Sequence, residues 1–61
     1  MAVRMTVFFS DGYKKIFICD DDEDATMTRD DILAGGHQEK SEHRHVFYPP
    51  HAVAKIVFET E

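Results

Sequence analysis

VRMTVFFSDGYKKIFIC, residues 3–19, contains the strongest local signal for the fold. Two runs rich in β-branched and aromatic residues flank the dipeptide Asp11-Gly12. Runs of this composition favour β-strands, and Asp-Gly supplies the positive φ angles that a two-residue type I′ turn needs. The stretch therefore predicts an N-terminal β-hairpin.

A two-residue turn would also fix which residues face each other across this hairpin. The resulting core face is Met5, Val7, Phe9, Ile16 and Ile18. The opposite face is Thr6, Phe8, Tyr13, Lys15, Phe17 and Cys19. Because Phe8, Tyr13 and Phe17 make that second face unusually aromatic, they either pack under another element or form the interface of an isologous homodimer.

Five consecutive acidic residues, 20–24, follow the hairpin. Repulsion between like charges predicts a solvated loop there. A short helix is expected over residues 29–34, because Thr28 and Asp31 have the spacing of a capping box and two glycines at 35–36 favour a helix end.

The rest of the chain predicts two further strands. The segment GGHQEKSEH, residues 35–43, is polar and is expected to be a loop. HRHVFY is strand-like, Pro49-Pro50 interrupts pairing, and a last strand is expected from about Ala54. The predicted order is β-β-α-β-β in one domain, residues 1–61, a mainly β (α+β) fold.

Strand, proline-containing turn and strand in VFYPPHAVAKIVF, residues 46–58, resemble the end of SH3-like and Sm-like barrels. The glycines and basic residues of an Sm-like RNA binder are absent. The sequence therefore leaves open a small antiparallel sheet with a helix on one face, or a partly open SH3/Sm-like barrel.

Charge and length restrict the classes of function. A chain of 61 residues with a net charge of −5 forms a small core and disfavours binding to nucleic acid or to anionic membranes, which need clustered Lys and Arg. The N-terminal segment lacks the features of a secretory signal, so a cytoplasmic location is expected. Cys19 is the single cysteine, which excludes an intramolecular disulfide.

The four histidines are the candidate metal ligands, at His37, His43, His45 and His51. His43 and His45 are two residues apart, which places both rings on one face of a strand, a spacing that zinc and copper sites use. The paired cysteines of many zinc sites are absent. Exposed strand histidines and a pH-sensitive surface are the alternatives.

The acidic run is the second candidate site. Asp20, Asp22 and Asp24 occupy calcium-loop positions, but Ala25 stands where such a loop needs glycine. Seven of the twelve acidic residues lie within residues 20–31, and a compact acidic protein can present carboxylates to a basic groove and compete with nucleic acid for it. The proposed interaction residues in this run are Asp20, Asp21, Asp22, Glu23 and Asp24.

No pattern in the sequence indicates an enzyme or a bound cofactor. Cys19 is followed by acids that disfavour its thiolate, and Ser10 lacks the surroundings of a nucleophile elbow. The sequence therefore predicts a non-enzymatic acidic binding protein, of a bacterial or phage accessory system, that binds a basic protein surface and forms a homodimer. The alternative is a histidine-based transition-metal-binding protein.

Overall fold

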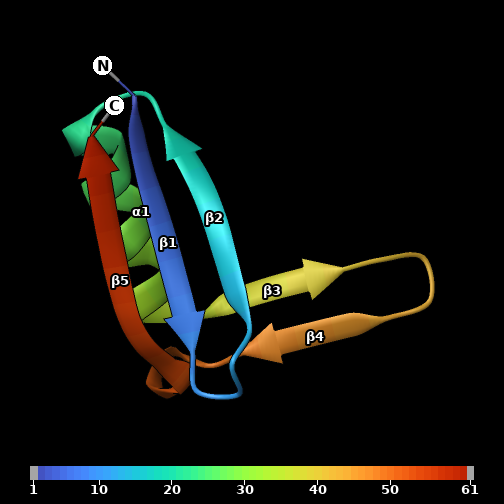
Figure 1. Cartoon of the computed structure of the whole chain (residues 1–61). Coiled ribbons are helices and arrows are strands. Elements are labelled where there is room, and N and C mark those ends of the chain that lie inside the picture. Colours follow the sequence, from blue (N-terminus) through green and yellow to red (C-terminus); the bar gives the residue numbers. More distant parts are fainter. Residues whose placement is uncertain (1, 61) are drawn as a thin grey trace.

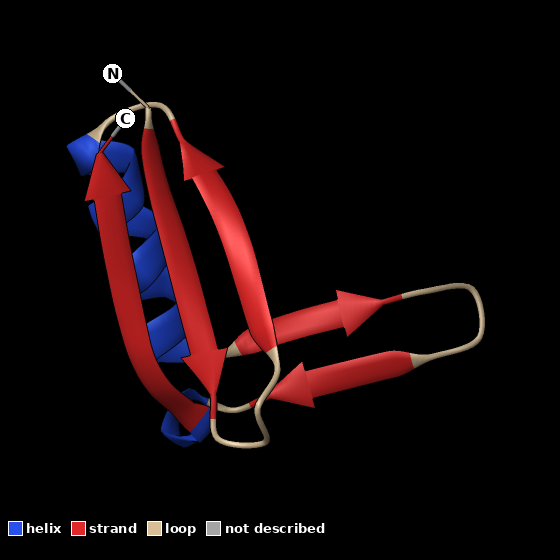
Figure 2. Ribbon diagram, viewed as in Figure 1, coloured by secondary structure: helices blue, strands red, loops and turns tan. Residues whose placement is uncertain are grey.

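The computed structural model describes residues 2–60. Two layers make up the body of the molecule (Figure 1): a three-stranded antiparallel sheet and one helix behind it. A second sheet of two strands projects sideways as an arm (Figure 2). The elements, in chain order, are β1 (Val3–Phe9), β2 (Lys14–Cys19), α1 (Asp22–Gly35), β3 (His37–Lys40), β4 (His45–Tyr48), a 3₁₀ turn (Pro50–Ala52) and β5 (Val53–Thr60).

The predicted α+β class and the antiparallel sheet are confirmed, with one strand more than expected. The strand order in the large sheet is β2-β1-β5, so the first and last strands of the chain pair side by side. The sheet is open, because β2 and β5 remain its two edges, and it does not close into a barrel.

The β1-β2 hairpin forms as predicted, but its predicted register is wrong by one residue. The backbone N–H of Phe9 donates to the Tyr13 carbonyl at 2.8 Å, which leaves three loop residues between them. Only Gly12 has a positive φ, 94°, whereas a type I′ turn needs two such residues. The loop is instead a type I turn ending in a glycine bulge, and the Asp11 carboxylate accepts the Tyr13 N–H.

The register change turns every side chain of β2 to the face opposite the predicted one. Met5 now pairs with Phe17, and Val7 pairs with Lys15. Phe17 and Cys19 therefore face the helix, while Ile16 and Ile18 face solvent.

Helix α1 is longer than predicted and includes the acidic run that was expected to be a loop. Its N-cap is Asp21, whose carboxylate accepts the N–H of Asp24 at 2.8 Å. Acidic residues in a first helical turn interact favourably with the helix dipole, which outweighs the repulsion between solvated carboxylates. The expected capping box does not form, since the Thr28 hydroxyl donates to the Asp24 carbonyl within the helix.

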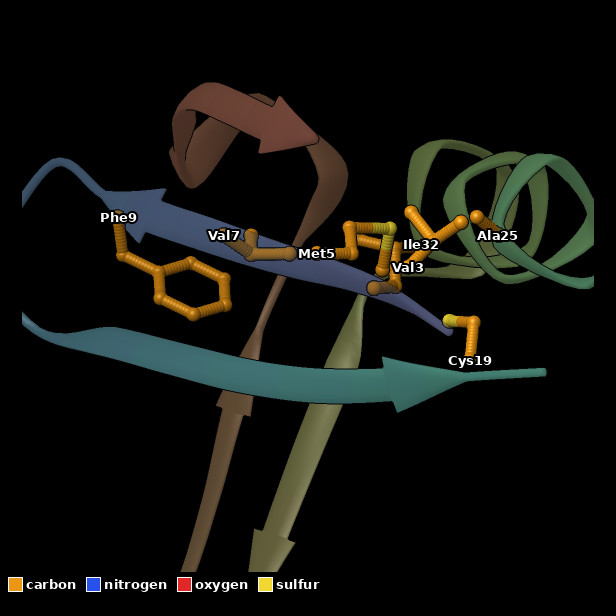
Figure 3. Close-up of a cluster of buried hydrophobic side chains, with 7 residues drawn as sticks. All are labelled: Val3, Met5, Val7, Phe9, Cys19, Ala25 and Ile32. Carbon is orange, nitrogen blue, oxygen red and sulfur yellow. The ribbon is translucent and has the colours of Figure 1, made fainter. Parts of the chain in front are cut away.

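The core lies between α1 and the helix-facing side of the sheet (Figure 3). Its buried members are Val3, Met5, Val7, Phe9, Cys19, Ala25 and Ile32. Four of them alternate along β1, so the central strand supplies most of the core. Full burial of side chains such as Met5 and Val7 stabilises the fold by about 1.5–3 kcal/mol each.

The arm replaces the loop that was expected at residues 35–43. Residues His37–Lys40 pair with His45–Tyr48 in an antiparallel hairpin. A two-stranded hairpin is marginal by itself, and this one is held by the stacking of Tyr48 on Phe9, with ring centroids 4.1 Å apart. The polar strand β3 is thus a product of tertiary packing.

Candidate interaction surfaces

The acidic residues predicted to act in binding lie at and before the start of α1. Asp20, Asp21, Asp22, Glu23 and Asp24 are all exposed. Asp21 caps the helix, and the Asp24 carboxylate also accepts the backbone N–H of Asp20 at 3.1 Å. These hydrogen bonds connect the run to the first turn of α1.

The acidic surface continues along the outer face of α1. Glu23, Met27 and Asp30 are spaced at i, i+4 and i+7, which places them on one face of the helix. Met27 is 60% exposed and Leu33 50% exposed, so apolar side chains stand among the acids. We call this surface the acidic face; its members are Asp22, Glu23, Met27, Asp30, Asp31 and Leu33.

Within residues 2–60, only one carboxylate of the acidic face has a cationic partner. Arg29 contacts Asp30 at 3.0 Å. Residues 20–31 contain seven acids and one arginine, a charge of −6, so the remaining residues together carry +1. The negative charge of the protein is therefore concentrated on the helix.

The other side of the sheet is a second surface, which we call the open face. It consists of the residues of β2, β1 and β5 on the side of the sheet away from α1, and no described element crosses it (Figure 1). Thr6, at its centre, is buried between its neighbours. The exposed fraction is 47% for Ile16 and 66% for Ile18, which is high for isoleucine in a sheet. Its nine members are Ile18, Arg4, Glu59, Ile16, Thr6, Val57, Lys14, Phe8 and Lys55.

A third feature, which we call the corner, is the place where the arm packs on the body. Its rings are Phe9, Tyr13, Phe17, His37 and Tyr48. Phe9 stacks on Tyr48 and on Tyr13, and the rings of Tyr13 and Tyr48 are nearly parallel, with centroids 5.8 Å apart. His37 lies against Phe17 edge to face at 5.5 Å. This aromatic cluster joins β1, β2 and both strands of the arm.

Glu39 is the polar centre of this corner. Its carboxylate lies 3.0 Å from the His37 ring nitrogen Nε2, accepts the Tyr13 hydroxyl at 3.1 Å and lies 3.6 Å from Lys15 Nζ. The hydrogen bond with His37 is the main reason that the pKa of Glu39 is lowered. The hydrogen bond to Glu39 in turn raises the pKa of Tyr13.

A shallow pocket of about 250 Å³ opens beside Glu39. It is lined by Tyr13, Glu39, Lys40, Ser41, Arg44, Val46 and Tyr48. The Tyr48 hydroxyl donates to Asp11 at 3.0 Å, and desolvation is the main reason that the pKa of Tyr48 is raised. The Ser41 hydroxyl donates to the Arg44 carbonyl, so the hydroxyls of Ser41 and Tyr48 are both engaged within the protein.

The four histidines are not brought together. His37 lies in the corner, His43 in the exposed loop of the arm, His45 against Gln38 at 3.0 Å, and His51 in the 3₁₀ turn. Among residues 2–60, no group of three or more His, Cys, Asp or Glu side chains has the geometry to hold a metal ion.

Phe8, Tyr13 and Phe17 do not share the face that the predicted register gave them. Phe8 lies on the open face, where Lys55 Nζ is 4.8 Å from its ring centroid. Phe17 packs against the core from the helix side, and Tyr13 belongs to the corner. Cys19 is buried in the core, as a small apolar side chain.

Sequence reasoning missed Ile16 and Ile18 as surface residues. Their exposure depends on the three-residue turn, which is the next most common way of closing a hairpin. Asp11-Gly12 is compatible with both the two-residue and the three-residue turn, so the sequence alone does not distinguish them.

Comparisons of the chain with protein-family models, with curated proteins and with solved structures found no match. In the part of the chain that the structure describes, no helix is both long and apolar enough to cross a membrane.

Proposed function

We propose that this chain is a non-enzymatic binding protein that docks the acidic face of α1 onto a basic surface of another protein. The observation that carries the proposal is the concentration of charge: a net charge of −6 on residues 20–31 against +1 elsewhere. Complementary charges of this kind accelerate association and select the partner.

The acidic face also has the composition of an interface. Met27 and Leu33 offer exposed apolar anchors, and the surrounding carboxylates form a polar rim. Because the helix is capped at Asp21 and packed through Ala25 and Ile32, these groups are held in place before binding, which lowers the entropy lost on association. A groove that otherwise takes nucleic acid is one basic surface that fits.

The test is a zero-length carbodiimide crosslinking experiment in cells that express the protein. The reagent joins carboxylates to lysines in direct contact, so it reports both sides of such an interface. We expect crosslinks from Glu23, Asp30 or Asp31 to lysines of one partner. Crosslinks confined to Glu39, Glu42 or Glu59 would contradict the proposal.

A matched pair of variants tests the affinity for the partner found in this way. Replacing Glu23, Asp30 and Asp31 by their amides should weaken binding at least about 100-fold and reduce its salt dependence. Replacing Glu42 and Glu59 by Gln removes acids elsewhere and should leave the affinity within about threefold. Equal losses of affinity in the two variants would mean that binding depends on net charge alone, which would contradict a specific role for the acidic face.

A further inference from the structure

The strand register arranges the open face as three rows of three residues. The row nearest the chain ends is Ile18, Arg4 and Glu59. The middle row is Ile16, Thr6 and Val57, and the row nearest the β1-β2 turn is Lys14, Phe8 and Lys55. The middle is therefore uncharged, and lysines lie at the opposite end from the glutamate.

We propose that this face binds a second copy of the chain, sheet against sheet. The two-fold axis lies in the plane of the interface and is perpendicular to the strands. The interface uses the side of the molecule opposite the acidic face, so the inference does not depend on the proposed function. The dimer would have four layers, helix, sheet, sheet and helix, with an acidic face on each outer side.

The rotation reverses the order of the rows and keeps each strand opposite its own copy. Lys55 then faces Glu59 of the second copy, and this pairing occurs twice. Ile16 meets Ile16 and Val57 meets Val57 at the centre. Two twisted sheets pack in this way about 10 Å apart at about 30°, a distance that long charged side chains can span.

A further contact of this arrangement is also compatible. Lys14 faces Ile18 of the second copy, where its methylene stem covers the apolar side chain while the ammonium reaches water. Ile16 and Ile18, about half and two thirds exposed in the single chain, both become covered. The face is thus complementary to itself in charge and in apolar surface.

Two other arrangements fit less well. A two-fold axis parallel to the strands would place Lys14 opposite Lys55 of the second copy, which opposes like charges. Docking of the open face onto α1 of the next copy would be heterologous and would continue into open-ended assemblies. A three-stranded face is small for an obligate dimer, so we expect a weak dimer that dissociates on dilution.

The first experiment places the same substitution two residues apart on β2. Sedimentation equilibrium over a wide concentration range should show a monomer–dimer equilibrium for the natural chain. Ile16→Glu opposes two carboxylates at the axis and should weaken the dimer at least about 100-fold. Ile18→Glu faces Lys14 of the second copy and should leave the dimer as tight or tighter.

The second experiment is a charge exchange on β5. Lys55→Glu or Glu59→Lys alone should weaken the dimer at least about tenfold, and the double variant should return to within about threefold of the natural chain. Lys40→Glu and Glu42→Lys on the arm are the matched controls and should leave dimerisation unchanged. Circular dichroism and thermal unfolding confirm that each variant is folded.

Three results would overturn the proposal. They are a natural chain that is monomeric throughout the concentration range, a dimer that folded Ile16→Glu leaves intact, or oligomers that keep growing with concentration. Because Ile16 and Ile18 are both exposed in the single chain, their variants stay informative even if Glu59→Lys fails to fold. Dimerisation is measured without any other protein, so its failure is distinct from failure of the acidic-face proposal.

Discussion

One residue, Gly36, determines the junction between the helix and the arm. Gly36 follows α1 with a φ of 81°, and its N–H donates to the Ile32 carbonyl at 2.8 Å. A Cβ at this position would collide with the Tyr48 carbonyl oxygen and touch the Phe47 ring. The chain can therefore turn from α1 into β3 only with glycine here.

Gly36→Ala should destabilise the protein by about 3 kcal/mol or more, because it combines a positive φ with a backbone collision. Gly35→Ala, one residue earlier, is the matched control. Gly35 lies in the helix with open space around its Cα, so alanine should be neutral or stabilise by about 0.5–1 kcal/mol. Urea unfolding measures both, and similar losses would contradict the described junction.

The corner around Glu39 makes stability depend on pH in two directions. The pKa of Glu39 is lowered, chiefly by the hydrogen bond with His37, so its contribution is present above the unfolded pKa and is lost as pH falls through the folded pKa. The pKa values of Tyr13 and Tyr48 are raised, so their contribution is present below pH about 10 and is lost as pH rises through the folded values.

The tyrosines give a direct optical test, because the chain has two tyrosines and no tryptophan. Tyrosinate absorbance should show both phenols titrating above pH about 10 in the folded protein and near 10 in urea. Glu39→Gln should lower the pKa of Tyr13 toward its ordinary value, while Glu42→Gln should not. Identical titrations in folded and unfolded protein would contradict the hydrogen bonds of the corner.

At the scale of elements, helix α1 shows how local electrostatics and capping place a boundary. The acidic run looks unfavourable if every carboxylate is counted as repulsive. Asp21 instead caps the helix, and Asp22, Glu23 and Asp24 lie in its first turn, where the dipole favours them. The sequence contains this signal, whereas the prediction from Thr28 and Asp31 placed the start of the helix too far along the chain.

Asp21→Ala should destabilise the protein by about 1 kcal/mol, because the N–H of Asp24 loses its acceptor. Asp21→Asn is the matched variant. It keeps a capping oxygen and removes the charge, so it should destabilise the protein by only a few tenths of the roughly 1 kcal/mol expected for alanine. Thermal unfolding separates the two variants. Equal losses would indicate that charge, rather than the cap, determines the start of the helix.

The β1-β2 register can be tested on two adjacent side chains of β2. Phe17→Ala should cost about 2–3 kcal/mol, since Phe17 packs on the core and on His37, while exposed Ile18→Thr should change stability by about 0.5 kcal/mol or less. The register predicted from a two-residue turn gives the reverse order. Chemical unfolding of both variants therefore decides which face of β2 is buried.

Across the whole molecule, the two layers separate the charges. The helix layer carries the acids of residues 20–31, and the open face of the sheet carries Arg4, Lys14 and Lys55 with Glu59. In the proposed dimer the basic and apolar sides meet and the acidic faces point outward in opposite directions. Each dimer would then present two binding faces to basic partners.

This arrangement predicts that the two surfaces act independently. The amide variant of Glu23, Asp30 and Asp31 should still dimerise, because none of these residues is on the open face. The Ile16→Glu monomer should keep its intrinsic affinity for a partner and lose only the gain from bivalency. Sedimentation and a monovalent binding assay measure the two properties separately. A variant that lost both while remaining folded would contradict this independence.

The sequence alone predicts the hairpin around Asp11-Gly12, the mainly β class and the acidic character of residues 20–31. These features depend on local composition and spacing, which act over a few residues. The tertiary structure alone decided the register of β2, the pairing of β1 with β5 and the strand character of residues 37–40. The register of β2 depends on which of two turns Asp11-Gly12 forms, and the sequence allows both. The other two features depend on contacts between residues distant in the chain, such as the stacking of Tyr48 on Phe9, which leave no local sequence pattern.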